Sequence, residues 1–231
     1  FRTTCPQSSE SEKMTEEGKI TVKEYKKPDV KLSEIRRYLG CIGGTETAGN
    51  ENRKELDRLI SDCLKLTETA GGLSYFTASR RYRLSFTEDG LLDLGFCRTD
   101  SKNLQKNLEN CSEIVLFCAT VGRQIDLLTS RYRQASPSKA VCLQAIGAER
   151  VESLCDAFCN ELKDEEERKG RTTRPRFSPG YGDLTLLLQK DIFSALELNK
   201  TLGVFLNDSL LMLPSKTVTA IVGIKPIEKK Q

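Results

Sequence analysis

The run Arg174-Pro175-Arg176-Phe177-Ser178-Pro179-Gly180-Tyr181-Gly182-Asp183 is the least ordinary stretch of this chain. Its two prolines each fix φ at about −65° and lack an N–H donor, so the run cannot lie inside a helix or a central strand. Its two glycines allow positive φ or a close approach of the backbone to another group. The sequence therefore predicts a stiff, extended loop that presents the side chains of Arg176, Tyr181 and Asp183. The alternative is a plain surface turn, because loops rich in proline and glycine are common.

Two blocks in the C-terminal part of the chain resemble a known family. Arg176-x-x-Pro179-Gly180-Tyr181 resembles the Arg-x-x-x-Gly-Tyr signature of the activation (reactivation) domain of vitamin B12-dependent methionine synthase. Residues 206–215, Leu-Asn-Asp-Ser-Leu-Leu-Met-Leu-Pro-Ser, are similar to the Leu-Thr-Glu-Ser-x-x-Met-x-Pro segment of that domain. As a whole, the chain looks more like the short stand-alone versions of this domain than like the one fused to the full enzyme.

The resemblance implies that the first block binds S-adenosylmethionine. A guanidinium such as Arg176 matches the carboxylate of this ligand with two parallel hydrogen bonds. The ring of Tyr181 suits the adenine or the sulfonium, since cation–π contacts contribute about 0.5–2 kcal/mol. In the family the residue two after the arginine acts through its main chain, so Ser178 in place of alanine is expected to be tolerated. Pro179 and Gly180 complete this part of the expected site, because glycine lets the ligand approach the backbone.

Asp156 is the remaining candidate binding residue. The resemblance implies that an acidic residue just before Ala-Phe binds the ligand, and Asp156-Ala157-Phe158 matches this pattern with Asp in place of Glu. A carboxylate close to Arg176 would bind the ammonium group with a charged hydrogen bond of about 1.5–3 kcal/mol. The alternative is a carboxylate that faces water at the flank of the helix. The full-length enzymes carry a ligand-contacting tyrosine about where Val222 falls, so one contact is expected to be missing.

Hydrophobic periodicity predicts a mixture of helices and strands. We expect helices at 32–39 with Ser33 as its N-cap, at 51–67, after Ser101, after Gly122, at 138–163 and at 184–198. We expect strands at 20–22, 75–86, 91–96, 113–120, 202–206 and 217–224. Residues 164–169 are expected to be a solvated helix end or linker, and the basic run 80–83 a solvated strand face rather than a nucleic-acid face. The fold class is therefore α+β. The resemblance, not the periodicity, implies a mainly antiparallel twisted sheet with packed helices.

Composition narrows the class of protein further. With 231 residues, 38% hydrophobic and 30% charged, the chain is typical of a globular protein. The net charge of +3 is too small to indicate nucleic-acid binding. No apolar run is long enough to span a membrane, and the first residues lack the apolar stretch of a signal peptide, so we expect a cytoplasmic protein. Residues 1–20 are polar and expected to be disordered, and residues 21–231 are expected to form one activation-domain-like unit.

The chain contains no histidine and nine cysteines. The absence of histidine excludes the Ser-His-Asp and Cys-His nucleophile systems and the usual zinc sites. The cysteine count is odd and no pair has C-x-x-C spacing, so we expect reduced thiols that mostly act as small buried hydrophobes. We therefore predict no catalytic residue and no metal site of this chain itself. If cobalamin is involved, it arrives on another protein.

The resemblance implies a stand-alone reactivation module. In that chemistry the cob(II)alamin of a partner methionine synthase, or another corrinoid protein, takes one electron from an external donor such as a flavodoxin and then the methyl group of S-adenosylmethionine. The module would act by positioning, and proximity alone contributes up to about 7–11 kcal/mol. One alternative is a non-catalytic module that docks on a corrinoid protein. Another alternative is a small-molecule methyltransferase that depends on S-adenosylmethionine. The absence of a glycine fingerprint after a first strand counts against this alternative.

Overall fold

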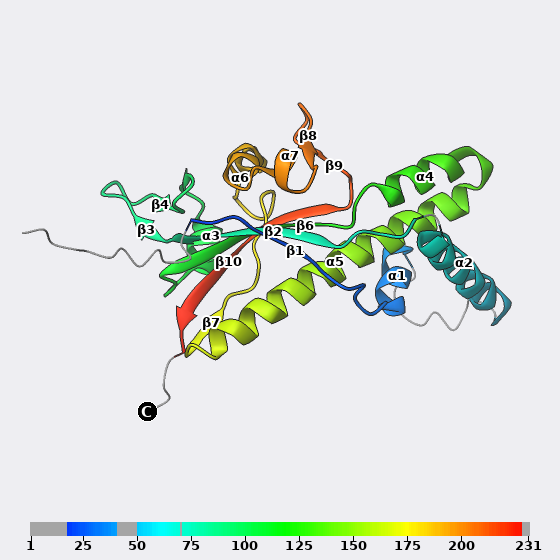
Figure 1. Ribbon diagram of the computed structural model, residues 1–231, viewed down its shortest axis with the longest axis horizontal. Coiled ribbons are helices and arrows are strands. Elements are labelled where there is room, and N and C mark those ends of the chain that lie inside the picture. Colours follow the sequence, from blue (N-terminus) through cyan, green and yellow to red (C-terminus); the bar gives the residue numbers. More distant parts are fainter. Residues whose placement is uncertain (1–17, 41–49, 70, 228–231) are drawn as a thin grey trace, which may run out of the picture.

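The computed structural model describes residues 18–40, 50–69 and 71–227 (Figure 1). Most of the segment expected to be disordered, 1–17, and the cysteines Cys5 and Cys41 lie outside the described residues. The helices are α1 (Leu32–Tyr38), α2 (Asn50–Thr69), α3 (Lys102–Asn107), α4 (Gln124–Ala135), α5 (Pro137–Glu167), the short 3-10 helix η1 (Leu186–Leu188), α6 (Gln189–Ala195) and α7 (Leu198–Thr201). The strands are β1 (Thr21–Glu24), β2 (Phe76–Arg83), β3 (Ser85–Phe86), β4 (Leu92–Asp93), β5 (Arg98–Thr99), β6 (Glu113–Thr120), β7 (Arg171–Thr173), β8 (Phe205–Leu206), β9 (Met212–Leu213) and β10 (Thr217–Pro226).

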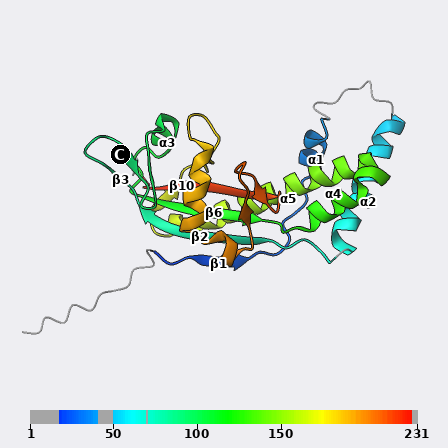
Figure 2. The same ribbon diagram turned by 90° about the horizontal axis from the view of Figure 1, so that it is seen from above.

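Within the described residues, the main sheet has five strands in the order β1-β2-β6-β10-β7, and every pairing is antiparallel. Figure 2 shows β1, β2, β6 and β10 of this sheet in that order. The central strand β6 is apolar from Ile114 to Ala119, as is typical of a strand with both faces covered. It pairs with β10 from Thr217↔Thr120 to Ile224↔Glu113. The antiparallel sheet with packed helices confirms the predicted α+β class.

Helices and loops cover the two faces of the sheet differently. Ile114, Leu116 and Cys118 of β6 point to the face that carries α3, α6 and the surrounding loops. The alternate residues Val115, Phe117 and Ala119 point to α5, where Phe117 stacks on Phe158 with ring centroids 4.4 Å apart. Figure 1 shows α5 on one side of the sheet and α6, α7, β8 and β9 on the other. The first half of α5 extends past the sheet and packs with α1, α2 and α4 around a third cluster.

A buried arginine attaches the N-terminal segment to α5. The side chain of Arg150 is 1% exposed and forms an ion pair with Glu149. Its guanidinium also donates to the carbonyl oxygens of Pro28 at 2.6 Å and Asp29 at 2.7 Å. Glu149 in turn accepts a hydrogen bond from the backbone N–H of Lys31 at 3.0 Å. Residues 28–31 are therefore held against α5 by buried polar contacts rather than by apolar packing alone.

Several sequence-based boundaries are confirmed and others are wrong. Strand β6 begins and ends where its apolar run does, and Ser101 caps α3 by accepting from the N–H of Leu104 at 3.1 Å. Ser33 is not an N-cap, because α1 begins at Leu32 and Lys31 holds that position without a side-chain hydrogen bond. The helix expected at 184–198 is instead divided among η1, α6 and α7, with Glu197 in the left-handed conformation at φ 48°. The strands expected at 91–96 and 202–206 are shorter, and β7 was not predicted at all.

The expectation of a solvated segment at 164–169 is wrong for Glu166, whose side chain is fully buried. Glu166 is ion-paired with Arg81 at 2.7 Å and with Arg171 of β7 at 2.6 Å. Arg81 belongs to the basic run 80–83, which we expected to be a solvated face, yet its side chain is only 19% exposed. The end of α5 lies against β7, and buried charges of this kind are tolerated because each has an oppositely charged partner.

The cysteines in the described part of the chain are free thiols. Cys63, Cys118, Cys142 and Cys155 are buried and act as small hydrophobic residues. Among the described helices, none combines the length and the apolar character that crossing a bilayer requires.

Candidate functional site

The loop at 174–183 follows β7 and continues along the edge of β10. The N–H of Arg174 donates to the carbonyl of Gly223 at 2.8 Å, and Phe177 and Ile221 exchange two backbone hydrogen bonds at 2.9 and 2.8 Å. The loop is therefore fixed to the sheet between its two prolines. This agrees with the predicted extended conformation, because prolines are tolerated where a strand is at the edge of a sheet.

The second half of the loop turns sharply and is attached to α3. Gly180 and Gly182 both have positive φ, 91° and 54°. Asp183 accepts from the hydroxyl of Ser101 and from the N–H groups of Lys102 at 2.8 Å and Asn103 at 3.2 Å. Asp183 is thus engaged by the N-terminus of α3.

Gly182 offers a test of this turn. A methyl group added to Gly182 would overlap the side chain of Asn103, whereas one added to Gly203, which has the similar φ of 63°, would meet nothing within 4 Å. Left-handed backbone costs a non-glycine residue about 1–2 kcal/mol, and overpacking costs about 1–3 kcal/mol more. Gly182→Ala is expected to lower the free energy of unfolding by about 2–5 kcal/mol and the control Gly203→Ala by only about 1–2 kcal/mol, as measured by urea denaturation. Equal losses would show that the contact with Asn103 is unimportant.

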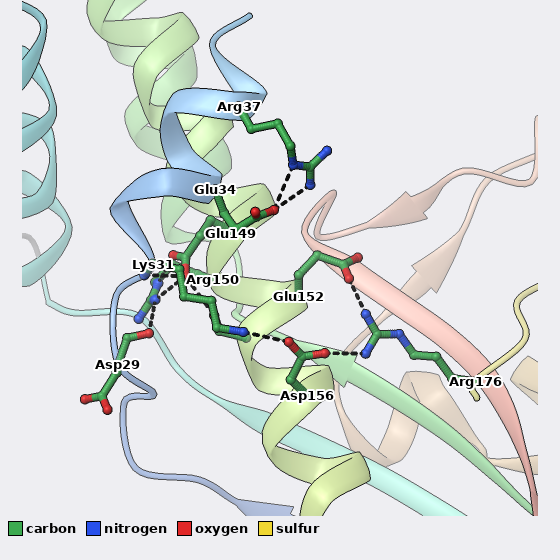
Figure 3. A network of polar contacts seen from close by, with 10 residues as sticks. Asp29, Lys31, Glu34, Arg37, Glu149, Arg150, Glu152, Asp156 and Arg176 are labelled. Carbon is green, nitrogen blue, oxygen red and sulfur yellow. Dashed lines mark hydrogen bonds and ion pairs between the residues drawn. The ribbon is translucent and has the colours of Figure 1, made fainter. Parts of the chain in front are cut away.

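Arg176 is the centre of a charged cluster on the face of α5 (Figure 3). Its Nη1 donates to Asp156 Oδ1 at 2.7 Å, and its Nη2 donates to Glu152. The two acidic residues are four apart on the helix, so they lie one above the other on the same face. Lys31 completes the cluster, since its Nζ lies 2.8 Å from Asp156 Oδ2. The structure therefore brings Arg176 and Asp156 together.

These contacts keep Arg176 and Asp156 ionised. Burial acts to lower the pKa of Arg176, but the hydrogen bond to Asp156 and neighbouring groups raise this pKa above its ordinary value. Burial acts to raise the pKa of the Asp156 carboxyl, but hydrogen bonds from Lys31 and Arg176 outweigh it and hold this pKa below its ordinary value. Both side chains are consequently charged at neutral pH.

A cavity of about 670 Å³ opens beside this cluster. One wall is the 174–183 loop with the start of η1, the other is the β8–β9 hairpin and its turn, and the first residues of β10 lie between them. It is lined by Glu152, Arg176, Phe177, Ser178, Pro179, Tyr181, Leu186, Gln189, Asn207, Leu210, Leu211, Met212, Leu213, Ser215, Thr217, Val218 and Thr219. Both blocks that carry the family resemblance therefore contribute to the same cavity.

The predicted site residues occupy different places around this cavity. Arg176, Ser178, Pro179 and Tyr181 line it, and Tyr181 is 69% exposed. The backbone of Gly180 forms the turn that presents Tyr181, while Asp156 lies behind Arg176 and is not a lining residue. Val222, about where the full-length enzymes were expected to carry a ligand-contacting tyrosine, is 1% exposed and packs in the cluster under α5. It does not line the cavity.

Sequence reasoning missed Glu152 and Gln189. Glu152 lies one helical turn before Asp156, and that four-residue spacing is the signal that could have identified it. Gln189 is almost fully buried and accepts a hydrogen bond from Thr219 at 2.9 Å, so it links α6 to the floor of the cavity. No sequence pattern marked Gln189, because its contact joins residues far apart in the chain.

Large apolar side chains surround the mouth of the cavity. Tyr181 and Leu186 project from one wall, and Leu211 and Leu213 project from the other. These side chains are between 39% and 69% exposed. We call these four residues the apolar collar. A concentration of exposed apolar side chains of this kind is typical of an interaction surface.

Comparison with known proteins identifies the fold to which this site belongs. A solved structure described as the MetH reactivation domain bound to AdoHcy is similar to the chain, with a TM-score of 0.63 and 15% identity, over 93% of this chain and 81% of that one. The chain thus has the fold of the MetH reactivation domain. No family model matches the sequence, and no curated protein matches it.

Proposed function

We propose that the chain binds S-adenosylmethionine in the cavity beside Arg176 and holds its methyl group for transfer to the cobalt of a cobalamin carried by a partner protein. The observation that supports this most is the placement of Arg176 and Tyr181 on one wall of the cavity. The cavity volume of about 670 Å³ lies in the range of small-molecule sites, about 300–1,000 Å³. In the solved structure with this fold, the domain is bound to AdoHcy.

Several residues around the cavity have a role in this proposal. Arg176 binds the ligand carboxylate with a charge-assisted fork. Tyr181 lies against the adenine or the sulfonium, where an aromatic face is favourable for a cation. The backbone from Ser178 to Gly180 approaches the ligand directly. On the other wall, Asn207 is already engaged in its own turn, since its Oδ1 accepts from the N–H groups of Ser209 and Leu211. Its role is therefore to shape the wall.

The partner in this proposal is a cobalamin-carrying methionine synthase or another corrinoid protein, and the apolar collar is the surface on which it docks. The partner supplies the cobalt that accepts the methyl group, and an external donor such as a flavodoxin supplies the electron that reactivation requires. The chain itself excludes water and fixes the direction of the methyl group, which is the kind of contribution that proximity makes. Such a module acts in the cytoplasm, where methionine synthase and its reductant meet.

The apolar collar also favours a second candidate, a docking module that binds a corrinoid protein without binding the ligand. The collar alone would serve this function, because apolar contact with a partner does not need Arg176 or the cavity. Ligand binding distinguishes the two candidates.

Calorimetric titration with S-adenosylmethionine and with S-adenosylhomocysteine tests the proposal. We expect weak binding of both at one site, and weaker binding of adenosine, which lacks the group that Arg176 binds. Capture of a purified corrinoid protein by the same preparation is the second measurement. Capture without ligand binding would support the docking module, and the absence of both would contradict either function.

A further inference from the structure

We infer that Glu152, and not Asp156, is the carboxylate that receives the ammonium group of the ligand and so selects an α-amino acid end. This inference rests on the proposed function, because it concerns the same cavity. It departs from the expectation of the sequence, in which Asp156 has this role.

Both oxygens of Asp156 already accept a hydrogen bond from a cationic side chain of the protein. Its Oδ1 accepts from Arg176 at 2.7 Å and its Oδ2 from Lys31 at 2.8 Å. Lys31 is itself held in place, because its backbone N–H is bonded to Glu149. Asp156 also lies outside the lining of the cavity. A ligand ammonium at Asp156 would compete with the ammonium of Lys31, so Asp156 acts as a positioning residue that orients Arg176.

Glu152 lines the cavity, and Asp156 does not. The two side chains are similarly exposed, at 39% and 41%, so the place of Glu152 at the cavity distinguishes it. Its Oε2 contacts Arg176, while in the described part of the chain no hydrogen-bond donor contacts its Oε1. An ammonium group can therefore bind Oε1 without breaking the ion pair. In Figure 3 the carboxylate of Glu152 lies on the turn of α5 before Asp156, beside the guanidinium that would take the ligand carboxylate.

The charges of the cluster support the same assignment. Arg176 and Lys31 contribute two positive charges, and Glu152 and Asp156 contribute two negative charges. The cluster is neutral, so it accommodates the zwitterionic end of an amino acid without excess charge. Neutralising Glu152 would leave one excess positive charge, which favours a ligand that carries a carboxylate but no ammonium.

The test compares S-adenosylhomocysteine with its analogue in which hydrogen replaces the α-amino group. The wild-type chain is expected to bind S-adenosylhomocysteine about 10- to 100-fold more tightly than the analogue, the ratio that corresponds to one charged hydrogen bond. Glu152→Gln is expected to remove most of this preference while it binds the analogue at least as well as the wild type does. Dissociation constants from calorimetry give both ratios.

Two variants of the same helix serve as controls. Glu161 is 37% exposed and ion-paired with Lys23, close to the 39% of Glu152, but it lies away from this cavity. Glu161→Gln should keep the full preference. Asp156→Asn should weaken both ligands by the same factor, because it loosens Arg176 and leaves Glu152 in place.

The remaining outcomes overturn the inference in distinguishable ways. An unchanged preference in Glu152→Gln would show that Glu152 does not contact the ammonium. Tighter binding of S-adenosylhomocysteine by this variant would show that Glu152 competes with the ligand for Arg176. If the wild type binds neither ligand, the proposed function itself is wrong, and the assignment of Glu152 is overturned with it.

Discussion

Arg176→Ala is expected to weaken the binding of S-adenosylmethionine by about 100-fold or more. The substitution removes two charge-assisted hydrogen bonds to the ligand carboxylate, each contributing about 1.5–3 kcal/mol. It also leaves the carboxylates of Glu152 and Asp156 without the guanidinium that neutralises them on that side. The cluster would then carry one excess negative charge, because only Lys31 remains beside the two carboxylates, so the loss exceeds that of a simple contact.

Arg176→Lys is the matched variant for this prediction. It keeps the positive charge but cannot form the planar fork, so we expect an affinity between those of the wild type and the alanine variant. Calorimetry measures the binding, and far-UV circular dichroism verifies that the fold is retained. Equal affinities for the wild type and Arg176→Ala would exclude the cavity beside Arg176 as the ligand site.

Arg150→Ala is expected to have the largest effect on stability, lowering the free energy of unfolding by about 3–5 kcal/mol. The side chain of Arg150 is 1% exposed, and its removal leaves the equally buried carboxylate of Glu149 without its cation. The carbonyl groups of Pro28 and Asp29 lose their donors as well. An unpaired buried charge is costly because no water replaces the missing partner. The segment that carries Lys31 should detach from α5 as a consequence.

Urea denaturation of the wild type and the variant measures this effect. Lys200→Ala is the control, because Lys200 also pairs with a glutamate, Glu197, but is 80% exposed. An exposed pair contributes about 0–1 kcal/mol, so this variant should differ little from the wild type. If Arg150→Ala were as stable as Lys200→Ala, the buried contacts of residues 28–31 would not anchor that segment.

The agreement between sequence and structure is best where a local pattern carries the information. Strand β6 contains a continuous apolar run and is buried on both faces, and α5 has an apolar stripe along its length. Both elements can therefore be predicted without knowledge of distant residues. The predicted loop contains its own conformational constraints in two prolines and two glycines. Arg176 and Tyr181 could be identified as candidates because they lie within that loop.

The disagreements have a common physical cause. Strand β7 is three residues long and forms because β10 offers it an edge, which no short pattern can show. Glu166 is buried because Arg81 and Arg171 reach it from distant parts of the chain. A run of charged residues looks the same in sequence whether its partners are water or buried arginines.

The sequence by itself determined the α+β class, the positions of the longest elements and the loop that carries the candidate arginine, because these depend on residues that are close together in the chain. Only the tertiary structure decided which carboxylate faces the cavity. Glu152 and Asp156 have the same charge and lie on the same face of α5, and what separates them is Lys31, which the chain brings to Asp156 from 125 residues away. The reason is that ion pairing is set by distance in space, and that distance exists only once the N-terminal segment has folded onto α5.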